Sequence, residues 1–464
     1  MAIKGKTKIV ATLGPASSSP DVIGKLIDSG MSVARINFSH GTHDSHEHLF
    51  YEVKKQAALR SVSVAVLGDL CGPKIRVGEL GDGFLLKKDH EVTLFPEGKS
   101  GDIPVNQAVL FNDLQKDAIV LLNDGAFSLK VIDINLERAV CSVLTGGLLT
   151  SRKGINLPGT LLNLPTITEK DIDDIYFGLD LGLDFFAMSF VQNVGDIINA
   201  RRYVQHIPLI AKIERPQAVE DLDAIIEEAD GVMVARGDLG VEIGAEHVPV
   251  IQKLIIEKAR MKAKPVITAT QMFESMIHSS VPTRAEVSDV ANAVLDGTSA
   301  VMLSAESASG SYPVEAVSML SKTICEVEDN PYFKIASIKN DTYTSASDAI
   351  VTSAVNIAKH MNIKLIAVFS QTGETARLIS RFRNNIPVVA LTSRLEILSH
   401  LAISWGVIPL YFEDNSNLSK MLDSMNKLLI DKGFVSSGDT IAITFGYEGN
   451  EPGRTNTLKL HTVT

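Results

Sequence analysis

The chain has 464 residues, of which 45% are hydrophobic and 21% charged, and its formal net charge is −11. This length predicts two to four domains, and the apolar content is that of a well-packed globular protein. The negative charge argues against nucleic-acid binding, and no apolar run reaches the roughly 18 residues that a membrane span needs. The sequence also shows no signal-peptide pattern, and its three cysteines match no zinc or redox motif, so we expect a cytoplasmic protein.

Short apolar runs rich in β-branched residues alternate with amphipathic segments of helical length. Strands that alternate with helices predict a parallel sheet, and eight of them predict a closed barrel. We therefore expect an α/β protein in which residues 1–72 and 164–340 form a catalytic (β/α)8 TIM barrel. The eight predicted strands lie at 7–13, 32–38, 63–69, 184–190, 208–214, 230–236, 265–270 and 299–304.

Residues 73–163, between the third and fourth predicted strands, have a different pattern. The helical period is lost, and short alternating segments are separated by Gly, Asp and Asn, which predicts an inserted all-β domain with tight turns. The insert follows the C-terminal end of a barrel strand, and barrel enzymes have their active sites at that end. We therefore expect the insert to act as a lid over the active site.

The α/β alternation resumes in the last part of the chain. We expect residues 345–464 to form a separate C-terminal α/β domain with an open sheet. Its predicted strands lie at 364–370, 386–392, 407–412 and 440–445.

Polar side chains follow the ends of the predicted barrel strands, where a barrel enzyme carries its chemistry. For any single residue an ordinary ion pair is an equally good interpretation, but the set as a whole indicates a functional site. The set consists of Arg35, Asn37, Ser39, His40, Asp69, Lys74, Arg76, Lys212, Glu214, Arg236, Gly237, Asp238, Thr268 and Thr270.

The chemistry of this set favours phosphoryl transfer. Glu214 and Asp238 suit a Mg²⁺ (or Mn²⁺) ion that keeps its other positions for water and substrate. Such an ion would chelate a carboxylate and an adjacent enol oxygen of the substrate. Lys212 and Arg35 supply positive charge for a phosphoryl group in transfer. Free N–H groups of a short helix near Gly237 would suit a substrate carboxylate.

Two local patterns imitate known motifs. The tripeptide GKT at 5–7 resembles the end of a Walker A motif, but the first glycine of that motif would fall before residue 1. The histidine-rich tract 40–48 resembles a metal site, but the hydroxyl and acidic residues from Thr42 onward favour a solvated helix start. Only His40, which directly follows the strand-end cluster, stays a candidate.

Five segments resemble the signature blocks of the pyruvate kinase family, and the similarity runs over essentially the whole chain. The resemblance implies a barrel, a small β-barrel lid and a C-terminal effector domain, assembled as a homotetramer. It also implies Mg²⁺-dependent transfer of the phosphoryl group of phosphoenolpyruvate to ADP, which yields pyruvate and ATP in glycolysis. The segments are NFSHGTH (37–43), AKIERPQAVEDLDAI (211–225), VARGDLGVEI (234–243), VITATQMFESM (266–276) and PTRAEVSDVANAVLDG (282–297).

The resemblance also implies roles for individual residues. Lys212 would stabilise the phosphoryl transition state, and Thr270 would help to deliver a proton to the enolate carbon through water. With Arg35 these are the expected catalytic residues, while Glu214 and Asp238 would hold Mg²⁺. The expected contacts of phosphoenolpyruvate are Arg35, Lys212, Gly237, Asp238 and Thr270, and those of the nucleotide are Asn37, His40, Arg76 and Lys153.

One departure from the family pattern concerns a monovalent cation. Family members that require K⁺ hold it with the equivalents of Asn37, Ser39, Asp69 and a following threonine, and carry a glutamate in the segment that reads GPKIR here. In this chain Leu70 replaces the threonine and Lys74 replaces the glutamate. The ammonium group of Lys74 suits the position of the cation, so we expect that K⁺ is not required. The alternative is that Lys74 is a surface lysine.

In the C-terminal domain the segment SQTGET (370–375) resembles the phosphate loop of the family's allosteric site. A phosphorylated effector is therefore expected at Ser370, Thr372, Gly373 and Thr375, before a predicted helix. Fructose bisphosphate is not favoured, because nearby carboxylates would repel it unless arginines compensate. The carboxylates are Glu374, Glu448 and Glu451, and the arginines are Arg377, Arg381 and Arg454. A protein without allosteric control stays an alternative.

Two other functions were weighed. A pyruvate dikinase domain also uses phosphoenolpyruvate in a barrel, but it needs a phosphohistidine carrier domain, which this sequence does not supply. A non-catalytic or regulatory relative would be expected to have lost one of its central residues, and all four of them are present: Lys212, Glu214, Asp238 and Thr270.

Overall fold

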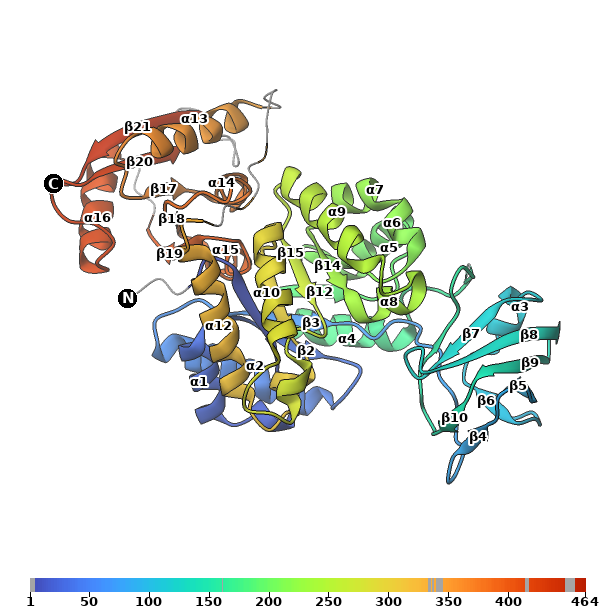
Figure 1. Cartoon of the computed structure of the whole chain (residues 1–464). Helices are drawn as coiled ribbons and strands as arrows, with labels where there is room; N and C mark the ends of the chain where they lie inside the picture. Colours follow the sequence, from blue (N-terminus) through green and yellow to red (C-terminus); the bar gives the residue numbers. More distant parts are fainter. Residues whose placement is uncertain are drawn as a thin grey trace.

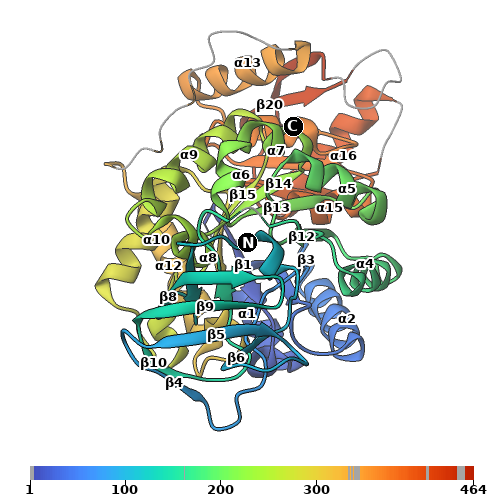
Figure 2. The same cartoon turned by 90° about the vertical axis from the view of Figure 1, so that its right-hand side faces the viewer.

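The computed structural model of the protein describes residues 5–160, 162–332, 335, 338, 345–413, 417–446 and 455–464. A central barrel separates the inserted domain from the C-terminal domain (Figure 1), and the inserted domain faces the viewer in Figure 2. No helix among these residues is both long and apolar enough to cross a membrane. The residue limits of the three domains stay predictions, and Glu448, Glu451 and Arg454 lie outside the described residues.

Eight parallel strands form a closed barrel, as the sequence predicts. Nearly every strand residue is buried on both faces, which explains the continuous apolar runs in the sequence. In the order of their hydrogen-bonded pairing around the barrel they are β1 (Lys8–Thr12), β2 (Met31–Asn37), β3 (Ala65–Asp69), β12 (Phe185–Met188), β13 (Leu209–Ile213), β14 (Gly231–Ala235), β15 (Val266–Ala269) and β16 (Ala300–Leu303).

Helices follow the barrel strands and cover the sheet. The helix that begins after Thr42 has a capping box between Thr42 and Ser45, which confirms the helix start predicted in the histidine-rich tract. The helices of this part of the chain are α1 (Pro20–Ser29), α2 (His43–Leu59), α4 (Glu169–Leu181), α5 (Val194–Val204), α6 (Pro216–Glu220), α7 (Leu222–Glu228), α8 (Arg236–Ile243), α9 (Val248–Met261), α10 (Arg284–Asp296), α11 (Ala305–Ala308) and α12 (Pro313–Asp329), with the short 3₁₀ helices η1 (Pro15–Ser17) and η2 (Glu274–Ile277).

The inserted domain is all-β apart from one short helix and has its own apolar core. Its six-stranded sheet has the order β11-β7-β8-β9-β5-β6, and β10 pairs separately with β4. Isolated bridges from Arg76 to Gly154 and from Val77 to Val105 connect the two edges of the larger sheet, so the domain approaches a small barrel. Its elements are β4 (Phe84–Leu86), β5 (Glu91–Pro96), β6 (Ile103–Val105), α3 (Leu110–Asp113), β7 (Ile119–Leu122), β8 (Phe127–Asn135), β9 (Arg138–Thr145), β10 (Gly147–Leu149) and β11 (Ile155–Asn156).

The C-terminal domain is an open five-stranded sheet in the order β19-β18-β17-β20-β21. Four strands are parallel, as expected, but the antiparallel edge strand β21 was missed, because its residues are mostly half-buried or exposed and lack a continuous apolar run. The elements are α13 (Ala346–His360), β17 (Ile366–Phe369), α14 (Glu374–Ser380), β18 (Val388–Thr392), α15 (Leu395–Leu401), β19 (Val407–Tyr411), α16 (Leu418–Asp431), β20 (Thr440–Phe445) and β21 (Thr457–Thr462).

The C-terminal domain packs against the end of the barrel at which the strands begin. Ala402 and Ile403, which follow α15, belong to the same apolar cluster as the interior of the barrel. The ammonium group of Lys8 at the start of β1 donates to the main-chain oxygen of Val407 at 2.8 Å. The lid and the C-terminal domain therefore occupy opposite ends of the barrel (Figure 1).

Candidate active site

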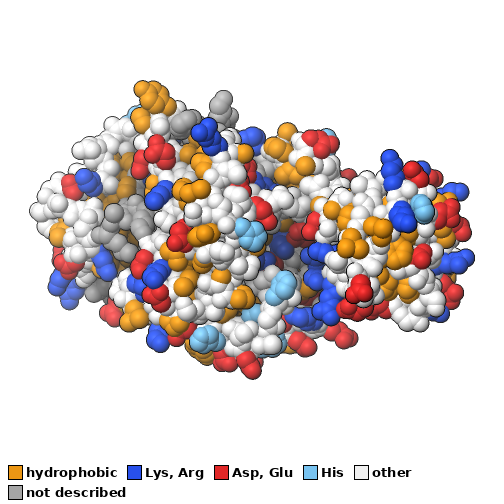
Figure 3. Space-filling model, turned by 60° about the horizontal axis from the view of Figure 1, so that its bottom comes forward, with side chains coloured by type: hydrophobic (Ala, Val, Ile, Leu, Met, Phe, Trp, Pro, Cys, Tyr) orange, Lys and Arg blue, Asp and Glu red, His pale blue; other side chains and the backbone are white. Residues whose placement is uncertain are grey.

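A cavity of about 140 Å³ lies at the ends of the barrel strands from which the lid emerges. In Figure 3, Lys, Arg and His side chains gather around the hollow between the body and the lobe on the right. Most of the residues predicted from strand ends line this cavity. They are Arg35, Asn37, Ser39, His40, Asp69, Lys74, Arg76, Lys212, Glu214, Asp238 and Thr270.

Asp69 holds two of the predicted cations in place. Arg35 Nε lies 2.7 Å from one carboxylate oxygen of Asp69, and Lys212 Nζ lies 3.4 Å from the other. Arg35 also donates to the hydroxyl of Thr12. Burial by itself would raise the pKa of Asp69, but the charges of Lys212 and Arg35 outweigh burial and lower it. Asp69 is therefore ionised at neutral pH and orients both cations toward the cavity.

Lys212 lies among three carboxylates. Its Nζ is 2.8 Å from Glu214 Oε1 and donates to the hydroxyl of Ser189 at 2.8 Å. Burial alone would lower the pKa of Lys212, but the charges of Asp69, Glu214 and Asp238 raise it. The lysine is therefore protonated at neutral pH.

Glu214 and Asp238 form an acidic pair suited to a divalent cation. Burial and the negative charge of Asp238 raise the pKa of Glu214, while Lys212 lowers it in part. Glu214 Oε2 accepts the main-chain N–H of Phe190 at 2.9 Å, which fixes the carboxylate. A divalent cation between two repelling carboxylates relieves that repulsion, so the donor set fits Mg²⁺. No group of three or more His, Cys, Asp or Glu suited to a metal occurs among the described residues.

The turn after β2 is organised by Asn37. The side-chain oxygen of Asn37 accepts the N–H of Ser39 at 3.1 Å, and its amide nitrogen lies 3.3 Å from His40 Nδ1. Burial, followed by the charges of Arg76, Lys74 and Arg35, lowers the pKa of His40. His40 is therefore neutral at pH 7, and several cations face the same space.

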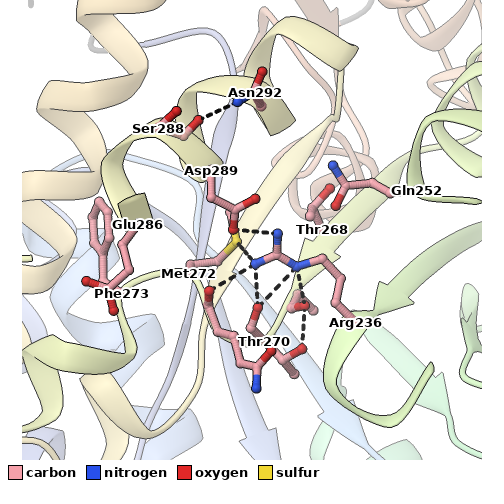
Figure 4. Close-up of polar contacts among 12 residues, drawn as sticks. Arg236, Gln252, Thr268, Thr270, Met272, Phe273, Glu286, Ser288, Asp289 and Asn292 are labelled. Atoms are coloured by element: carbon pink, nitrogen blue, oxygen red, sulfur yellow. Dashed lines mark hydrogen bonds and ion pairs between the residues drawn. The ribbon is translucent and has the colours of Figure 1, made fainter. Parts of the chain in front are cut away.

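Thr270 has a backbone conformation that a β-branched residue rarely adopts, with φ +69°, and Gln271 follows with φ +53°. Its hydroxyl accepts the N–H of Gly237 at 2.8 Å and donates to Ala269 O at 2.6 Å. Arg236 donates to the main-chain oxygens of Thr270 and Gln271 and pairs with Asp289 at 2.6 Å (Figure 4). The guanidinium group thus holds the strained segment that carries Thr270.

Some predicted residues lie elsewhere. Gly237 is outside the lining of the cavity, and its N–H is already bonded to Thr270. Lys153 of the lid is half-buried and does not line the cavity, although its main-chain oxygen accepts the N–H of Val77. Thr268 is fully buried, donates to the hydroxyl of Thr298 and does not line the cavity. The nucleotide role of Lys153 and the carboxylate role of Gly237 stay predictions.

The predicted effector loop lies in the C-terminal domain, after β17. Its hydroxyls make bonds within that domain: Ser370 Oγ accepts the N–H of Gly373, and the buried hydroxyl of Thr375 lies 2.6 Å from that of Thr455. Thr372 Oγ1 accepts the N–H of Glu374 at 3.4 Å. Gly373 has φ +77°, a conformation that favours glycine, and precedes α14.

Sequence reasoning did not select Ser189, Phe190 and Ser304, which line the cavity, or Thr12, which accepts a hydrogen bond from Arg35. Ser189 and Phe190 follow β12, and no residue was selected from the end of that strand. The strand-end rule that selected the other residues would also have found these two. No sequence pattern indicates a role for Thr12, because its contact with Arg35 depends on the register between β1 and β2.

Comparisons with known proteins indicate one family for the whole chain. Residues 4–317 match the family model described as pyruvate kinase, barrel domain, and residues 348–461 match that described as pyruvate kinase, alpha/beta domain. The chain is 41% identical to a pyruvate kinase of Geobacillus stearothermophilus, over 99% of this chain and 81% of that protein. It is 40% identical to one of Agrobacterium vitis, over 98% and 96%. A crystal structure of a pyruvate kinase from Cryptosporidium parvum superimposes with a TM-score of 0.91 at 36% identity, covering 99% of this chain and 97% of that one.

Proposed function

Because the chain belongs to the pyruvate kinase family, we propose that the cavity at the mouth of its barrel performs the family's reaction with the residues described above. The protein is a phosphotransferase that moves the phosphoryl group of phosphoenolpyruvate to ADP. The alternative of a non-catalytic relative is not favoured. The observation that carries the residue assignment is the network in which Asp69 and Glu214 hold Lys212 at the cavity.

Lys212 and Arg35 bind the phosphoryl group and stabilise the negative charge that spreads over its oxygens during transfer. Both cations are held by the buried carboxylate of Asp69, so they need little rearrangement as charge develops. Ser189 accepts a bond from the ammonium group of Lys212 and limits the directions in which it can point. Preorganised charge of this kind is the main source of catalysis in phosphoryl transfer.

Glu214 and Asp238 would hold Mg²⁺, and the N–H of Phe190 orients Glu214 for this role. When bound, the ion supplies a Lewis acid that stabilises the enolate and helps to bind the substrate carboxylate. Mn²⁺ has similar ligand preferences and is expected to substitute for it.

Thr270 helps to protonate the enolate carbon, through a water molecule that its hydroxyl orients. The hydroxyl lines the cavity and is itself oriented by Gly237 and by the main chain of Ala269. A water held in this way donates its proton from one side of the enolate only. The nucleotide occupies the side lined by Asn37, His40 and Arg76, where the lid can close over it with Lys153.

Lys74 makes the reaction independent of added K⁺. In support of this proposal, Lys74 lines the same cavity as Asn37, Ser39 and Asp69, and its charge contributes to the lowered pKa of His40. Asp69 forms its ion pairs with Arg35 and Lys212, so the ammonium group of Lys74 supplies charge to this region without a direct pair to Asp69. The buried Leu70 offers no oxygen ligand to a cation.

Three further expectations are carried over from the family and stay proposals. A phosphorylated effector binds at the loop 370–375, the subunits assemble as a homotetramer, and the protein is cytoplasmic. For the loop, the support is the run of hydroxyl groups and the glycine at positive φ before α14. Substitution of Ser370 and Thr375 by alanine should remove activation by a phosphorylated effector, and retained activation would place that site elsewhere.

The experiment that tests the proposed function measures pyruvate formation from phosphoenolpyruvate and ADP with Mg²⁺, first without K⁺ and then with K⁺ added. Full activity without K⁺ is expected. Activity only with K⁺ would support the proposed reaction but overturn the role of Lys74.

For the metal site, Glu214→Gln should raise the Mg²⁺ concentration needed for half-maximal rate, with Glu220→Gln on the surface of α6 as the control. An unchanged Mg²⁺ requirement would remove Glu214 from the ligand set.

A further inference from the structure

The main-chain N–H group that orients Glu214 belongs to a residue in a strained conformation. Phe190 follows β12 with φ +60°, a value that a bulky residue rarely adopts, and its N–H donates to Glu214 Oε2 at 2.9 Å. A residue keeps such a conformation only when its surroundings impose it. The position of the carboxylate of Glu214 therefore depends on the groups that hold Phe190.

Two neighbours hold the ring of Phe190. The first is Gly72, which lies where the chain leaves β3 for the lid. Gly72 has φ +68°, and a Cβ atom at this position would lie 2.7 Å from Phe190 Cδ2, so the ring packs directly against the glycine. The second is Arg215, whose guanidinium carbon lies 5.3 Å from the centre of the ring, within the range of a cation–π contact. Arg215 is buried and directly follows Glu214 in the chain.

Arg215 acts on a second buried carboxylate, that of Glu242 on α8. Burial raises the pKa of Glu242, and the positive charge of Arg215 opposes that rise more than any other group does. Attraction between two buried opposite charges is weakly screened by solvent. Glu242 therefore helps to keep the guanidinium group of Arg215 in its place over the ring of Phe190.

Glu242 also binds the lid. Its Oε1 accepts the side-chain N–H of Asn156 at 3.2 Å, and the main-chain N–H of Leu157 donates to the same carboxylate. Asn156 ends β11, the last strand of the lid, and Leu157 is buried in the apolar core of the lid. In Figure 1, α8 lies on the side of the barrel that faces the lid. The segment that enters the lid at Gly72 and the segment that leaves it after Asn156 therefore both make contacts that lead to Phe190.

We propose that Arg215 and Glu242 are positioning residues that couple the lid to the metal ligand Glu214. Neither of the two side chains lines the catalytic cavity, so both act through the ring and the N–H of Phe190. The inference rests on the proposed function, because it takes Glu214 as a ligand of the divalent cation. Coupling between two sites is reciprocal, so a cation at Glu214 steadies the segment that leaves the lid, and a lid held by Glu242 tightens binding of the cation.

The test measures binding of Mn²⁺ to the full-length protein without substrates, from the electron paramagnetic resonance signal of the free ion. Two variants conserve the charge around the metal, so a change in affinity cannot come from the net field. Asn156→Ala removes a contact between the lid and Glu242 and should weaken Mn²⁺ binding about threefold. Arg215→Lys removes the planar group over Phe190 and should weaken it about fivefold.

Each variant has a matched control. Asn163→Ala removes a similar bond from an amide to a carboxylate, because Asn163 Nδ2 donates to Asp113 Oδ1 at 2.8 Å away from Glu242. Arg202→Lys makes the same exchange at an exposed position on α5. Both controls should bind Mn²⁺ as the parent protein does.

The second readout is amide hydrogen exchange of the segment 155–160, which a purely local role of these residues would leave independent of the metal. Mn²⁺ should slow exchange of this segment in the parent protein, and the slowing should be at least about threefold smaller in Arg215→Lys and Asn156→Ala. Parent-like Mn²⁺ affinity and parent-like slowing in both variants would overturn the inference. The melting temperatures must match that of the parent, and Asn156→Ala alone decides the outcome if Arg215→Lys does not fold.

Glu214→Gln separates this inference from the proposed function. If this variant loses Mn²⁺ affinity while Asn156→Ala and Arg215→Lys keep that of the parent, the metal site stands and only the coupling is overturned. If Glu214→Gln binds Mn²⁺ as the parent does, Glu214 is not a ligand, and the metal assignment is overturned together with this inference.

Discussion

Arg236 donates a hydrogen bond of 2.6 Å to the main-chain oxygen of Thr270, a residue with φ +69°. The same guanidinium group donates to Gln271 O and pairs with Asp289, so its contacts fix the turn after β15 (Figure 4). A β-branched residue at positive φ persists only when its surroundings impose that conformation. Arg236 is therefore a positioning residue for the hydroxyl of Thr270.

Replacing Arg236 by lysine should lower kcat about 10- to 100-fold. Lysine keeps the charge but cannot reach Thr270, Gln271 and Asp289 together, and release of a strained backbone is worth about 1–3 kcal/mol. Steady-state kinetics should show the loss in kcat with a small change in the KM of phosphoenolpyruvate. Asp289→Asn keeps the shape of the partner and should have a smaller effect; an equal loss in both variants would assign the effect to the ion pair instead.

Lys212→Met should lower kcat by at least about a thousandfold, because it removes a preorganised charge from the transferring phosphoryl group. The raised pKa of Lys212 keeps the group charged below that pKa, so the parent enzyme should lose no activity through its deprotonation between pH 7 and 9. A pH–rate profile of kcat would check that no activity is lost between pH 7 and 9. Near-normal turnover of the methionine variant would remove Lys212 from the mechanism.

The pair of substitutions Lys74→Glu and Leu70→Thr should create a requirement for K⁺. The carboxylate removes the internal positive charge, and the threonine hydroxyl adds an oxygen ligand beside Asp69. We expect activity to rise at least about tenfold when K⁺ is added to the double variant, and to change little in the parent protein. The measurement is the rate of pyruvate formation by both proteins in Tris buffer, with and without KCl. Indifference of the double variant to K⁺ would count against the role of Lys74.

Lys170→Met should raise the KM for ADP several-fold and change kcat little. Lys170 on α4 donates to the main-chain oxygen of Phe38 at 2.8 Å and pairs with the buried Asp174, so it anchors the turn that carries Asn37 and His40. Loss of one such anchor is worth about 1 kcal/mol. Lys55→Met is the matched control, because Lys55 is exposed and pairs with Glu52 of its own helix, α2. An unchanged KM would show that the turn keeps its position without α4.

The three cysteines should differ in their reaction with iodoacetamide at pH 8. Burial raises the pKa of Cys141 to about 12, so this thiol is protonated at that pH and closed to the reagent. Cys71 and Cys325 are half-buried and should react first. Because Cys71 lines the catalytic cavity, its alkylation should inhibit the enzyme and phosphoenolpyruvate should slow it, as mass spectrometry with parallel activity assays would show. Alkylation of Cys141 before Cys71 would contradict this order.

The sequence alone predicted the eight barrel strands in order and most of the polar residues that line the candidate site. The eight barrel strands are buried on both faces, so they stand out as continuous apolar runs, and the residues just after them share one end of the barrel. The edge strand β21 is half-exposed and has no such run, which is why periodicity missed it.

Only the tertiary structure decided how the site residues are partnered. That Asp69 holds both Arg35 and Lys212, and that Arg236 fixes the strained Thr270, follows from the register of strands far apart in the chain. Likewise, Arg377 and Lys264 line one cavity only because the C-terminal domain packs on the barrel. A local pattern reports which residues share a face or an end, whereas distances between residues distant in sequence are set by closure of the barrel and docking of the domains.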